Sequence, residues 1–470
     1  MRSLILFGFL FASLNISAQN WTNLFNGKDF NGWKKLNGTA EYHIEGNEIV
    51  GVTKMKTPNT FLATEKMYGD FILELEYKVD PRMNSGIQIR SNSLPDYKDG
   101  RVHGYQVEID PSERAWSCGV YDEARRGWLY PLDMNPKARK AFKQNGWNHY
   151  RIEAIGNSIR TWINGVPATD LVDDMTAEGF IALQVHSIGK EEESGREIRW
   201  RNIHIQTENL VPSPWTSIPV VNLIPNNLSP QERAQGWELL FDGKSTDQWR
   251  NAHKENFPSK GWRVENGELI VESQGGGESQ GAGDIVTKEE FGMFEFQVEF
   301  MLSEGANSGI KYFITEEYLT NQTGKASAIG LEYQILDDKK HPDAKKGAAG
   351  NRTVASLYDM IPAHEKKIVK KPGEWNHARL IVSGERMEEW ISGGNRSARE
   401  MFKGAHVEHW LNYRKVLEYE RGTQAFQAIV ARSKYSKWEG FGRWQSGHIL
   451  LQEHGDEVHF RSIKVRRLGN

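Results

Sequence analysis

The stretch Phe71-Ile-Leu-Glu-Leu-Glu-Tyr77 ends in alternating apolar and acidic residues, and Phe294-Glu-Phe-Gln-Val-Glu-Phe300 repeats this pattern further along the chain. Successive side chains of a β-strand point to opposite faces, so a period of two predicts strands with one buried face. Turn signals such as Glu-Gly-Asn and Asn-Gly separate many such stretches, whereas helical periodicity is scarce. The pattern predicts an all-β protein whose antiparallel sheets pack as a sandwich.

These two strands belong to two copies of one sequence. Trp21-Thr-Asn-Leu-Phe-Asn-Gly-Lys28 matches Trp237-Glu-Leu-Leu-Phe-Asp-Gly-Lys244, and Asn84-Ser-Gly-Ile87 matches Asn307-Ser-Gly-Ile310. More matches follow in the same order, which chance rarely produces. We therefore expect two domains in tandem, at residues 19–207 and 236–470, joined by a linker at 208–235 that contains five prolines. Prolines stiffen an extended connection because they lack a backbone donor and hold φ nearly constant.

The second copy also carries an insertion. Its alignment breaks between Val382 and His406, where the first copy has only a short turn at Gly156-Asn157. The inserted residues are rich in Gly, Arg, Ser and Glu, so we expect a mobile excursion from a hairpin near residues 383–405.

The first residues resemble an export signal. Arg2 precedes an apolar run from Leu4 to Leu14, and small residues precede Gln19. This predicts a signal peptide at residues 1–18, cleaved after Ala18, and a periplasmic or secreted protein. The run is too short to span a membrane, and we expect no membrane anchor.

The composition is that of a folded globular protein. The 470 residues exceed one ordinary core, and 38% hydrophobic residues, 26% charged residues and a formal charge of −3 argue against disorder and against nucleic-acid binding. Cys118 is the single cysteine of the sequence, which rules out an intramolecular disulfide, and we expect an inert thiol there.

Polar residues in the first copy suggest a site on a sheet face. Gln106, Glu108 and Asp110 alternate along one predicted strand, which projects all three to the same side. Such residues often lie on a strand face that is simply exposed to solvent, but neighbouring segments also carry pairs of alternating polar residues. These pairs are Gln88 with Arg90, and Gln184 with His186. Carboxylates and amides grouped in this way can position a sugar and move a proton.

The second copy carries related polar residues in altered places. Lys311 replaces Gln88, Glu332 and Gln334 replace Gln106 and Glu108, and Gln452 and His454 replace Gln184 and His186. The acid and the amide have therefore exchanged places. Tyr121 and Tyr358 each precede an Asp at the start of a loop, where a tyrosine either donates a hydrogen bond, stacks on a sugar or simply packs.

The sequence gives no clear signal for metal binding, for nucleotide-dependent chemistry or for serine hydrolysis. His103, His186 and His454 lie near acidic residues, but none of the three belongs to a His-x-x-His or His-Glu-x-x-His spacing, so no cofactor is required and a divalent metal stays open. The sequence also lacks a phosphate-binding loop, and its Gly-x-Ser-x-Gly match at Gly277-Glu-Ser-Gln-Gly281 is not followed by a helical pattern as a nucleophile elbow requires, which argues against nucleotide-dependent chemistry and serine hydrolysis.

The assembled motifs resemble a known family. Those of the first copy are Leu24-Phe-Asn-Gly-Lys28, Gly104-Tyr-Gln-Val-Glu-Ile-Asp110, Tyr121-Asp-Glu-Ala-Arg-Arg-Gly-Trp128 and Leu183-Gln-Val-His186, and those of the second are Leu240-Phe-Asp-Gly-Lys244, Glu332-Tyr-Gln-Ile-Leu-Asp337 and Leu451-Gln-Glu-His-Gly455. They resemble the 3-keto-disaccharide hydrolase domain family. The resemblance implies concanavalin A-like jelly rolls in an exported bacterial protein.

The resemblance also implies a chemistry. The substrate would be an oligosaccharide or glycoside whose C3 hydroxyl has been oxidised to a ketone by a separate glycoside 3-dehydrogenase. The ketone acidifies the proton on C2, so that base-promoted elimination of the aglycone and hydration can follow.

We assign roles as hypotheses. Glu108 or His186 would be the base in the first copy, with Arg90 and Tyr121 supporting negative charge. In the second copy the base would be Glu332 or His454, with Lys311 and Tyr358 in support. Residues that would bind substrate are Gln88, Gln106, Asp110, Gln184, Gln334 and Gln452. The alternatives are a non-catalytic glycan-binding tandem and a structural or adhesion scaffold.

Overall fold

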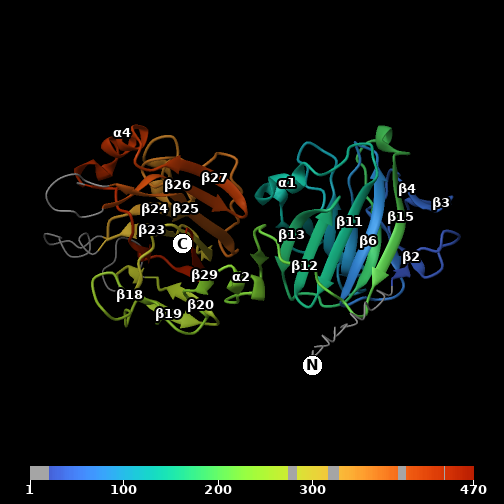
Figure 1. Ribbon diagram of the computed structural model, residues 1–470, viewed down its shortest axis with the longest axis horizontal. Coiled ribbons are helices and arrows are strands. Elements are labelled where there is room, and N and C mark those ends of the chain that lie inside the picture. Colours follow the sequence, from blue (N-terminus) through green and yellow to red (C-terminus); the bar gives the residue numbers. More distant parts are fainter. Residues whose placement is uncertain (1–20, 274–282, 316–327, 390–398, 439, 470) are drawn as a thin grey trace, which may run out of the picture. The chain divides into compact units, whose positions relative to one another are not determined.

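The structure is a computed structural model that describes residues 21–273, 283–315, 328–389, 399–438 and 440–469. The chain forms two compact units whose main boundary lies in the proline-rich segment, between Thr216 and Ser217. Strands dominate both units (Figure 1). The predicted signal peptide lies outside the described residues. Among the described helices, none is long and apolar enough to cross a membrane.

The described part of the first unit is a β-sandwich. One sheet has the strand order β13-β12-β11-β6-β15-β4-β3, with β1 paired to β15, and the other has the order β10-β9-β8-β7-β14-β5-β2. The strands are β1 Thr22–Asn23, β2 Trp33–Asn37, β3 Glu41–Glu45, β4 Glu48–Val52, β5 Thr60–Thr64, β6 Phe71–Val79, β7 Ser85–Asn92, β8 His103–Ile109, β9 Val120–Glu123, β10 Gly127–Tyr130, β11 Asn148–Ile155, β12 Ser158–Ile163, β13 Val166–Val172, β14 Phe180–Val185 and β15 Glu197–Gln206. A short helix, α1 (Pro136–Arg139), follows β10.

The second unit repeats this architecture within its described residues. Its sheets have the orders β19-β20-β29-β22-β25-β26-β27, with β17 paired to β29, and β18-β21-β28-β23-β24. The strands are β17 Trp237–Leu239, β18 Trp249–Asn251, β19 Trp262–Glu265, β20 Glu268–Val271, β21 Ile285–Thr287, β22 Phe294–Leu302, β23 Asn307–Ile314, β24 Leu331–Leu336, β25 Asn376–Glu389, β26 Arg399–Leu411, β27 Arg414–Glu420, β28 His448–Leu451 and β29 Val458–Arg467. The helices include α2 (Pro230–Ala234) before β17, and α4 (Gln424–Arg432) and η4 (Lys434–Lys437) between β27 and β28. Two jelly-roll-like β-sandwiches in tandem confirm the predicted fold class.

Alternation along the strands explains this packing. Phe71, Leu73, Leu75 and Tyr77 of β6 are fully or almost fully buried, while the intervening acidic residues face the outer side of the sheet. β22 buries every second residue in the same way, from Phe294 to Leu302. Burying one face of each sheet against the other removes a large apolar area from water, which stabilises the sandwich.

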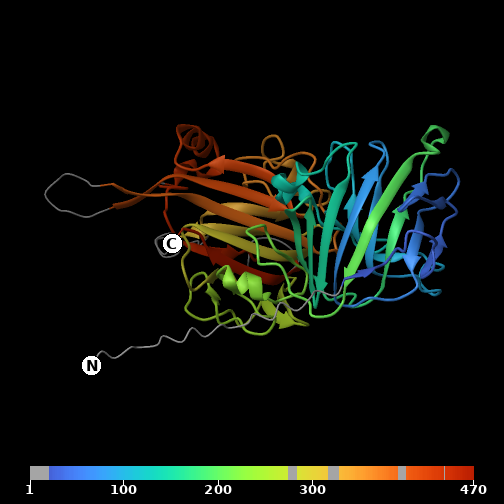
Figure 2. The same ribbon diagram turned by 45° about the vertical axis from the view of Figure 1, so that its right-hand side comes forward.

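The structure describes the start of the linker and the two strands that border the insertion. Arg160 donates to the carbonyl oxygens of Ser213 and Pro214, so the start of the linker packs on the first unit. The insertion in the second unit prolongs a hairpin, because the ladder between β25 and β26 continues to Glu389 opposite Arg399. Figure 2 shows these strands running beyond the rest of their sheet. Residues 390–398 lie outside the described part.

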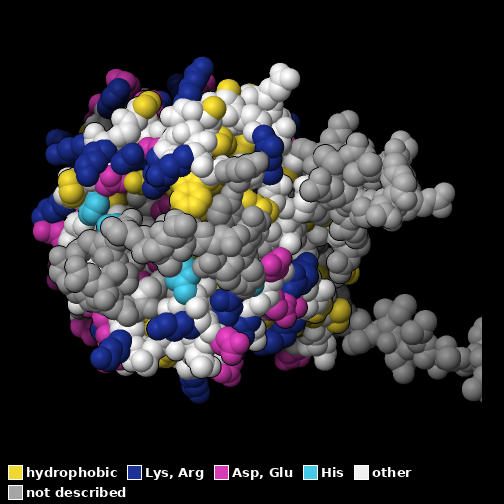
Figure 3. Space-filling model, turned by 90° about the vertical axis from the view of Figure 1, so that its left-hand side faces the viewer, with side chains coloured by type: hydrophobic (Ala, Val, Ile, Leu, Met, Phe, Trp, Pro, Cys, Tyr) yellow, Lys and Arg dark blue, Asp and Glu magenta, His cyan; other side chains and the backbone are white. Residues whose placement is uncertain are grey.

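The surface carries charges of both signs. On the face of the second unit drawn in Figure 3, Lys and Arg side chains lie among Asp and Glu side chains. This mixture agrees with the small net charge of the sequence.

Candidate functional site

The central candidate in the first unit is the carboxyl group of Glu108 on β8, a residue that is only 4% exposed. Asn84 Nδ2 donates to its Oε1 at 2.7 Å, and Gln106 Nε2 donates to its Oε2 at 2.9 Å. Arg114 lies 3.4 Å from Oε1. Burial raises the pKa of Glu108 from its usual 4.5 to about 7, although the hydrogen bonds oppose this shift. Such a group can both take up and release a proton near neutral pH.

A chain of hydrogen bonds orients this carboxyl group. Ser91 Oγ donates to Gln88 Oε1 at 2.7 Å, and Gln88 Nε2 donates to Gln106 Oε1, also at 2.7 Å. Gln106 then donates to Glu108, so each amide has one defined orientation. Gly86, opposite Glu108 in the ladder, leaves room for this arrangement, since a Cβ there would lie 2.5 Å from the Gln106 side chain.

A cavity of about 750 Å³ opens beside Glu108. Its wall includes Trp128, whose ring packs edge-on against Tyr121 with centroids 5.3 Å apart. His186 also lines the cavity, and its Nδ1 lies 2.6 Å from the carbonyl oxygen of Ser187. A carbonyl oxygen only accepts hydrogen bonds, so Nδ1 carries the proton and Nε2 of a neutral ring is left as an acceptor.

Asp110 positions the nearby cation. Its Oδ2 accepts a hydrogen bond from Arg114 Nε at 2.7 Å, and its Oδ1 accepts one from Ser112 Oγ at 2.6 Å. Burial raises the pKa of Asp110, but these hydrogen bonds outweigh it and lower the pKa overall. The Arg114 guanidinium also lies over the Trp128 ring, 4.9 Å from its centroid. Asp110 therefore holds Arg114 at the cavity, and its carboxylate is fully engaged in doing so.

The second unit has a smaller cavity, of about 120 Å³, at the equivalent sheet position. The ladder pairs Lys311 with Glu332 where the first unit pairs Gln88 with Gln106. Glu332 is buried, and Tyr435 Oη lies 3.5 Å from its Oε2. Lys311 Nζ lies 3.3 Å from the carbonyl oxygen of Ala328 and 3.6 Å from a carboxylate oxygen of Asp284.

A second lysine enters this cavity from the segment between β27 and β28. Lys434 Nζ lies over the ring of Tyr358, 4.2 Å from its centroid, and 5.0 Å from the centroid of Tyr435. Burial lowers the pKa of Lys434, while the nearby Glu332 opposes that shift. Burial also raises the pKa of Tyr358, whose hydroxyl donates to Asp343 Oδ2 at 2.7 Å. The ammonium groups of Lys311 and Lys434 therefore both belong to the lining of this cavity.

Two polar atoms of the second cavity lack a protein partner among the described residues. They are Asn307 Oδ1 and His454 Nδ1, and both are buried. Buried polar groups are nearly always hydrogen-bonded, so these atoms are suited to a bound ligand or water.

Both copies also match one family in sequence. Residues 20–206 and residues 236–466 each match the 3-keto-alpha-glucoside-1,2-lyase-like domain. The chain belongs to this family. The two matched regions correspond to the two copies of the internal repeat.

Three known proteins that are similar to this chain have names that refer to carbohydrates. A Bacteroides thetaiotaomicron protein named 3-keto-disaccharide hydrolase is 37% identical over 252 residues, which cover 50% of this chain and 79% of the relative. A crystal structure from Parabacteroides distasonis, described as a candidate glycosyl hydrolase, is 26% identical, covers 52% of this chain and 100% of that chain, and has a TM-score of 0.42. The carbohydrate-binding module CBM66 of Bacillus subtilis is 18% identical, covers 37% of this chain and 95% of that chain, and has a TM-score of 0.27.

The two family domains bring most of the predicted residues together. Those that line the cavities are Gln106, Glu108, Tyr121 and His186 in the first domain, and Lys311, Glu332, Gln334, Tyr358, Gln452 and His454 in the second. Gln88 and Asp110 lie behind the first cavity as supports for Gln106 and Arg114. Gln184 is fully buried and does not line the cavity, and its side-chain amide has no hydrogen-bond partner in the described residues.

Arg90 requires a correction, because it does not share the face of Gln88. The ladder between β7 and β8 is irregular after Ile89, and Arg90 has a φ of 44°, which turns its side chain away. Its guanidinium donates to the carbonyl oxygen of Gly156 at 2.7 Å and pairs with Asp70. Phe313 holds the matching position in the second domain, with a φ of 59°, and is buried in the core.

Several cavity residues were missed by the sequence analysis. Asn84 and Asn307 stand in the repeated Asn-Ser-Gly-Ile motif, so the comparison of the copies could have found them. Arg114 and Lys434 carry no such signal, because each comes from a segment that the two copies do not share.

Among the described residues, neither cavity brings together three His or acidic side chains close enough to share an ion. In the described part of the chain, three His or acidic side chains close enough to share an ion occur at His406, Glu408 and Glu418, which line neither of the two cavities.

Proposed function

We propose that the protein cleaves glycosides that carry a ketone at C3, and that the first domain performs the proton transfer with Glu108. The observation that carries this proposal is the buried carboxyl group beside a large cavity, with a pKa of about 7. A module that only binds sugar has no need for a carboxyl group poised in this way. The family and the relative from Bacteroides thetaiotaomicron support the same substrate class.

The first step is removal of the proton on C2. The C3 ketone withdraws electrons, so the C2–H bonding pair can move into an enolate with its negative charge on the C3 oxygen. Ionised Glu108 accepts the proton, and Arg114 with the hydroxyl of Tyr121 supports the charge on oxygen. The environment that raises the pKa of Glu108 favours the protonated product of this step.

The second step expels the aglycone. The enolate reforms the ketone as a double bond forms between C1 and C2, and the C1–O bond breaks. The departing oxygen takes the proton that Glu108 removed from C2, which returns Glu108 to its ionised form. Water then adds its hydroxyl to C1 and a proton to C2, so that one water molecule is consumed for each bond cleaved.

The second domain serves the same sugar class in a different way. The exchange of acid and amide places Glu332 at the position of Gln106, among Lys311, Lys434 and Tyr358. Two ammonium groups can hold the polarised oxygen of a keto-sugar. We therefore assign binding to the second domain and cleavage to the first.

The test uses the purified full chain with a 3-keto-glucoside and with the unoxidised glucoside, each with and without a chelator. We expect aglycone release from the keto compound alone, and incorporation of solvent deuterium at C2. No release from either compound would contradict an enzyme for these linkages and favour a glycan-binding tandem. Equal release from both would contradict the need for a ketone.

The proposed substrate requires an oxidising partner. A C3 ketone arises from a C3 hydroxyl by loss of two electrons and two protons, so an oxidation must precede the proposed cleavage. We expect a separate glycoside 3-dehydrogenase to make the substrate, and a mixture of the two enzymes should release aglycone from the unoxidised glucoside.

A further inference from the structure

A cluster of titratable side chains lies on the other sheet of the second domain, on strands β26 and β27. His406 and Glu408 lie two residues apart on β26, and Glu418 and Glu420 lie two residues apart on β27. The ladder places His406 opposite Glu420 and Glu408 opposite Glu418. Residues two apart on a strand share a face, so all four side chains project from the same side of the sheet.

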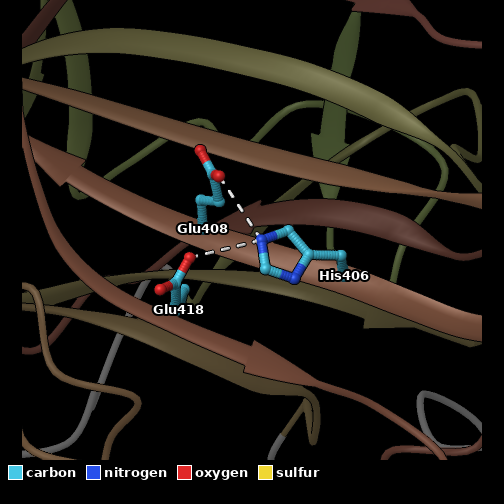
Figure 4. A group of neighbouring side chains, drawn as sticks. All are labelled: His406, Glu408 and Glu418. Carbon is cyan, nitrogen blue, oxygen red and sulfur yellow. Dashed lines mark hydrogen bonds and ion pairs between the residues drawn. The ribbon is translucent and has the colours of Figure 1, made fainter. Parts of the chain in front are cut away.

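Three of these side chains converge on one point. His406 Nε2 lies 3.3 Å from Glu408 Oε1 and 3.6 Å from Glu418 Oε2 (Figure 4). A tetrahedral zinc ion with bonds of about 2.1 Å holds its ligand atoms about 3.4 Å apart. The two distances from the imidazole match this spacing, and all three ligand atoms lie within 4.8 Å of one another.

A fourth side chain holds the imidazole in place. His406 Nδ1 lies 2.6 Å from Glu420 Oε1. This contact directs Nε2 at the oxygens of Glu408 and Glu418, so that one imidazole nitrogen and two carboxylate oxygens face a common point. Carboxylates that orient a metal-binding histidine through its second nitrogen are common.

Two neighbours define how the carboxylates would bind. Trp410 Nε1 donates to Glu408 Oε2 at 2.6 Å, which leaves Oε1 for the cation. Lys415 Nζ lies 2.6 Å from Glu418 Oε2 and 3.5 Å from Glu408 Oε1, so these oxygens already attract an ammonium group. The side chain of Lys415 is 38% exposed and can turn into solvent when an ion binds.

We propose that His406, Glu408 and Glu418 bind a divalent metal ion, with zinc favoured by one imidazole nitrogen and two carboxylate oxygens. Glu420 orients the imidazole, and water completes the coordination. The ion ties β26 to β27 and therefore stabilises the second domain. Because these residues line neither sugar cavity, the ion is not required for the proposed cleavage.

The proposal is tested on tag-free full-length protein that has been stripped with a chelator and dialysed. Calorimetric titration with zinc chloride should show one ion bound per chain at this site and a higher melting temperature. His406→Gln and Glu418→Gln should abolish both effects, and Glu420→Gln should weaken binding about 10- to 100-fold, as loss of an orienting partner does. Lys415→Met should strengthen binding because it removes the competing ammonium group.

His459 provides a matched control. It also lies between two glutamates, but Glu268 contacts its Nδ1 and Glu457 its Nε2, so no three ligands converge. His459→Gln should leave zinc binding unchanged. The proposal is overturned if the wild-type protein binds no zinc, or if His406→Gln and Glu418→Gln, shown by circular dichroism to be folded, bind it as the wild type does.

Discussion

The two candidate cavities of this protein lie at equivalent positions on corresponding sheets and differ in where the carboxyl group lies. In the first domain the ladder places Gln106 opposite Gln88 and Glu108 opposite Gly86, whereas the second domain places Glu332 opposite Lys311. The carboxyl group has therefore moved by two residues along the strand. The same sheet face is preserved because a shift of two residues keeps the side chain on one side.

This difference shows that the neighbours of a carboxyl group depend on its position along the strand, and that its pKa depends on those neighbours. Glu108 receives hydrogen bonds from two neutral amides and is buried, and its pKa rises to about 7. Glu332 instead lies within a cavity that contains Lys311 and Lys434. A duplicated domain can thus keep its fold and change its task by exchanging two neighbouring polar residues.

The largest expected effect separates the two carboxyl groups. Glu108→Gln should lower kcat on a 3-keto-glucoside by about 10²- to 10⁴-fold with little change in KM, because it removes the proton acceptor but keeps the shape. Glu332→Gln is the matched control and should lower kcat less than 10-fold. Steady-state kinetics of both variants check this, and the reverse order would assign cleavage to the second domain.

The pH dependence of stability sharpens the comparison further. The folded-state pKa of Glu108 is raised, so its protonated form stabilises the fold below about pH 4.5, and this contribution is lost as the pH rises to about 7. The loss should be on the order of 3 kcal/mol, since one pKa unit corresponds to about 1.4 kcal/mol. Hydrogen exchange of the β7–β8 peptides at pH 5 and pH 8, corrected for the intrinsic rate, measures it.

Glu108→Gln supplies the control for that experiment. The amide does not ionise, so the exchange protection of β7–β8 should no longer fall between the two pH values. The same drop in the variant would show that another group is responsible.

Two glycines, which lie against the side chains of Gln106 and Glu332, give a third test. A Cβ at Gly86 would lie 2.5 Å from the Gln106 side chain, and one at Gly309 would lie 2.6 Å from Glu332 Oε1. Each Gly→Ala change should cost about 1–3 kcal/mol of stability through overpacking. Gly86→Ala should also lower activity because it displaces Gln106, whereas Gly309→Ala should spare turnover. Melting curves and kinetics are measured together, and equal activity losses would contradict the division of tasks.

The smallest effect concerns Lys434, which belongs to the second cavity alone. In a Glu108→Gln background that cannot turn over substrate, calorimetry should detect two classes of sugar site. Lys434→Met should weaken one class about 5- to 10-fold, as expected for loss of one hydrogen bond worth about 1 to 1.4 kcal/mol. Lys437→Met, on the same segment but outside the cavity lining, should change neither class. An effect on both classes would contradict separate sites.

Much of this architecture was predictable from local patterns. The period-two alternation of Phe71–Tyr77 requires a buried face, and such a face requires a second sheet to cover it, so the sandwich follows from the sequence. Comparison of the two copies also placed Gln106 with Glu108, and Glu332 with Gln334, on one face each. These inferences hold because strand periodicity is a local property of the backbone.

The remaining features depend on contacts between residues far apart in the chain. Arg90 leaves the predicted face because of a bulge that sequence alternation cannot reveal. Lys434 reaches Tyr358 only because a segment 75 residues downstream of Asp359 folds back onto it, as the hydrogen bond between Lys434 N and Asp359 Oδ2 shows.

The sequence by itself determined that this protein is a tandem of two related β-sandwiches with polar sheet faces, because alternation and repetition are visible in one dimension. Only the tertiary structure decided that Glu108 is a buried acid with a pKa near 7, and that the cavity of the second domain is lined by Lys311 and Lys434. The physical reason is that burial and electrostatic environment are summed over neighbours in space, which the order of residues does not specify.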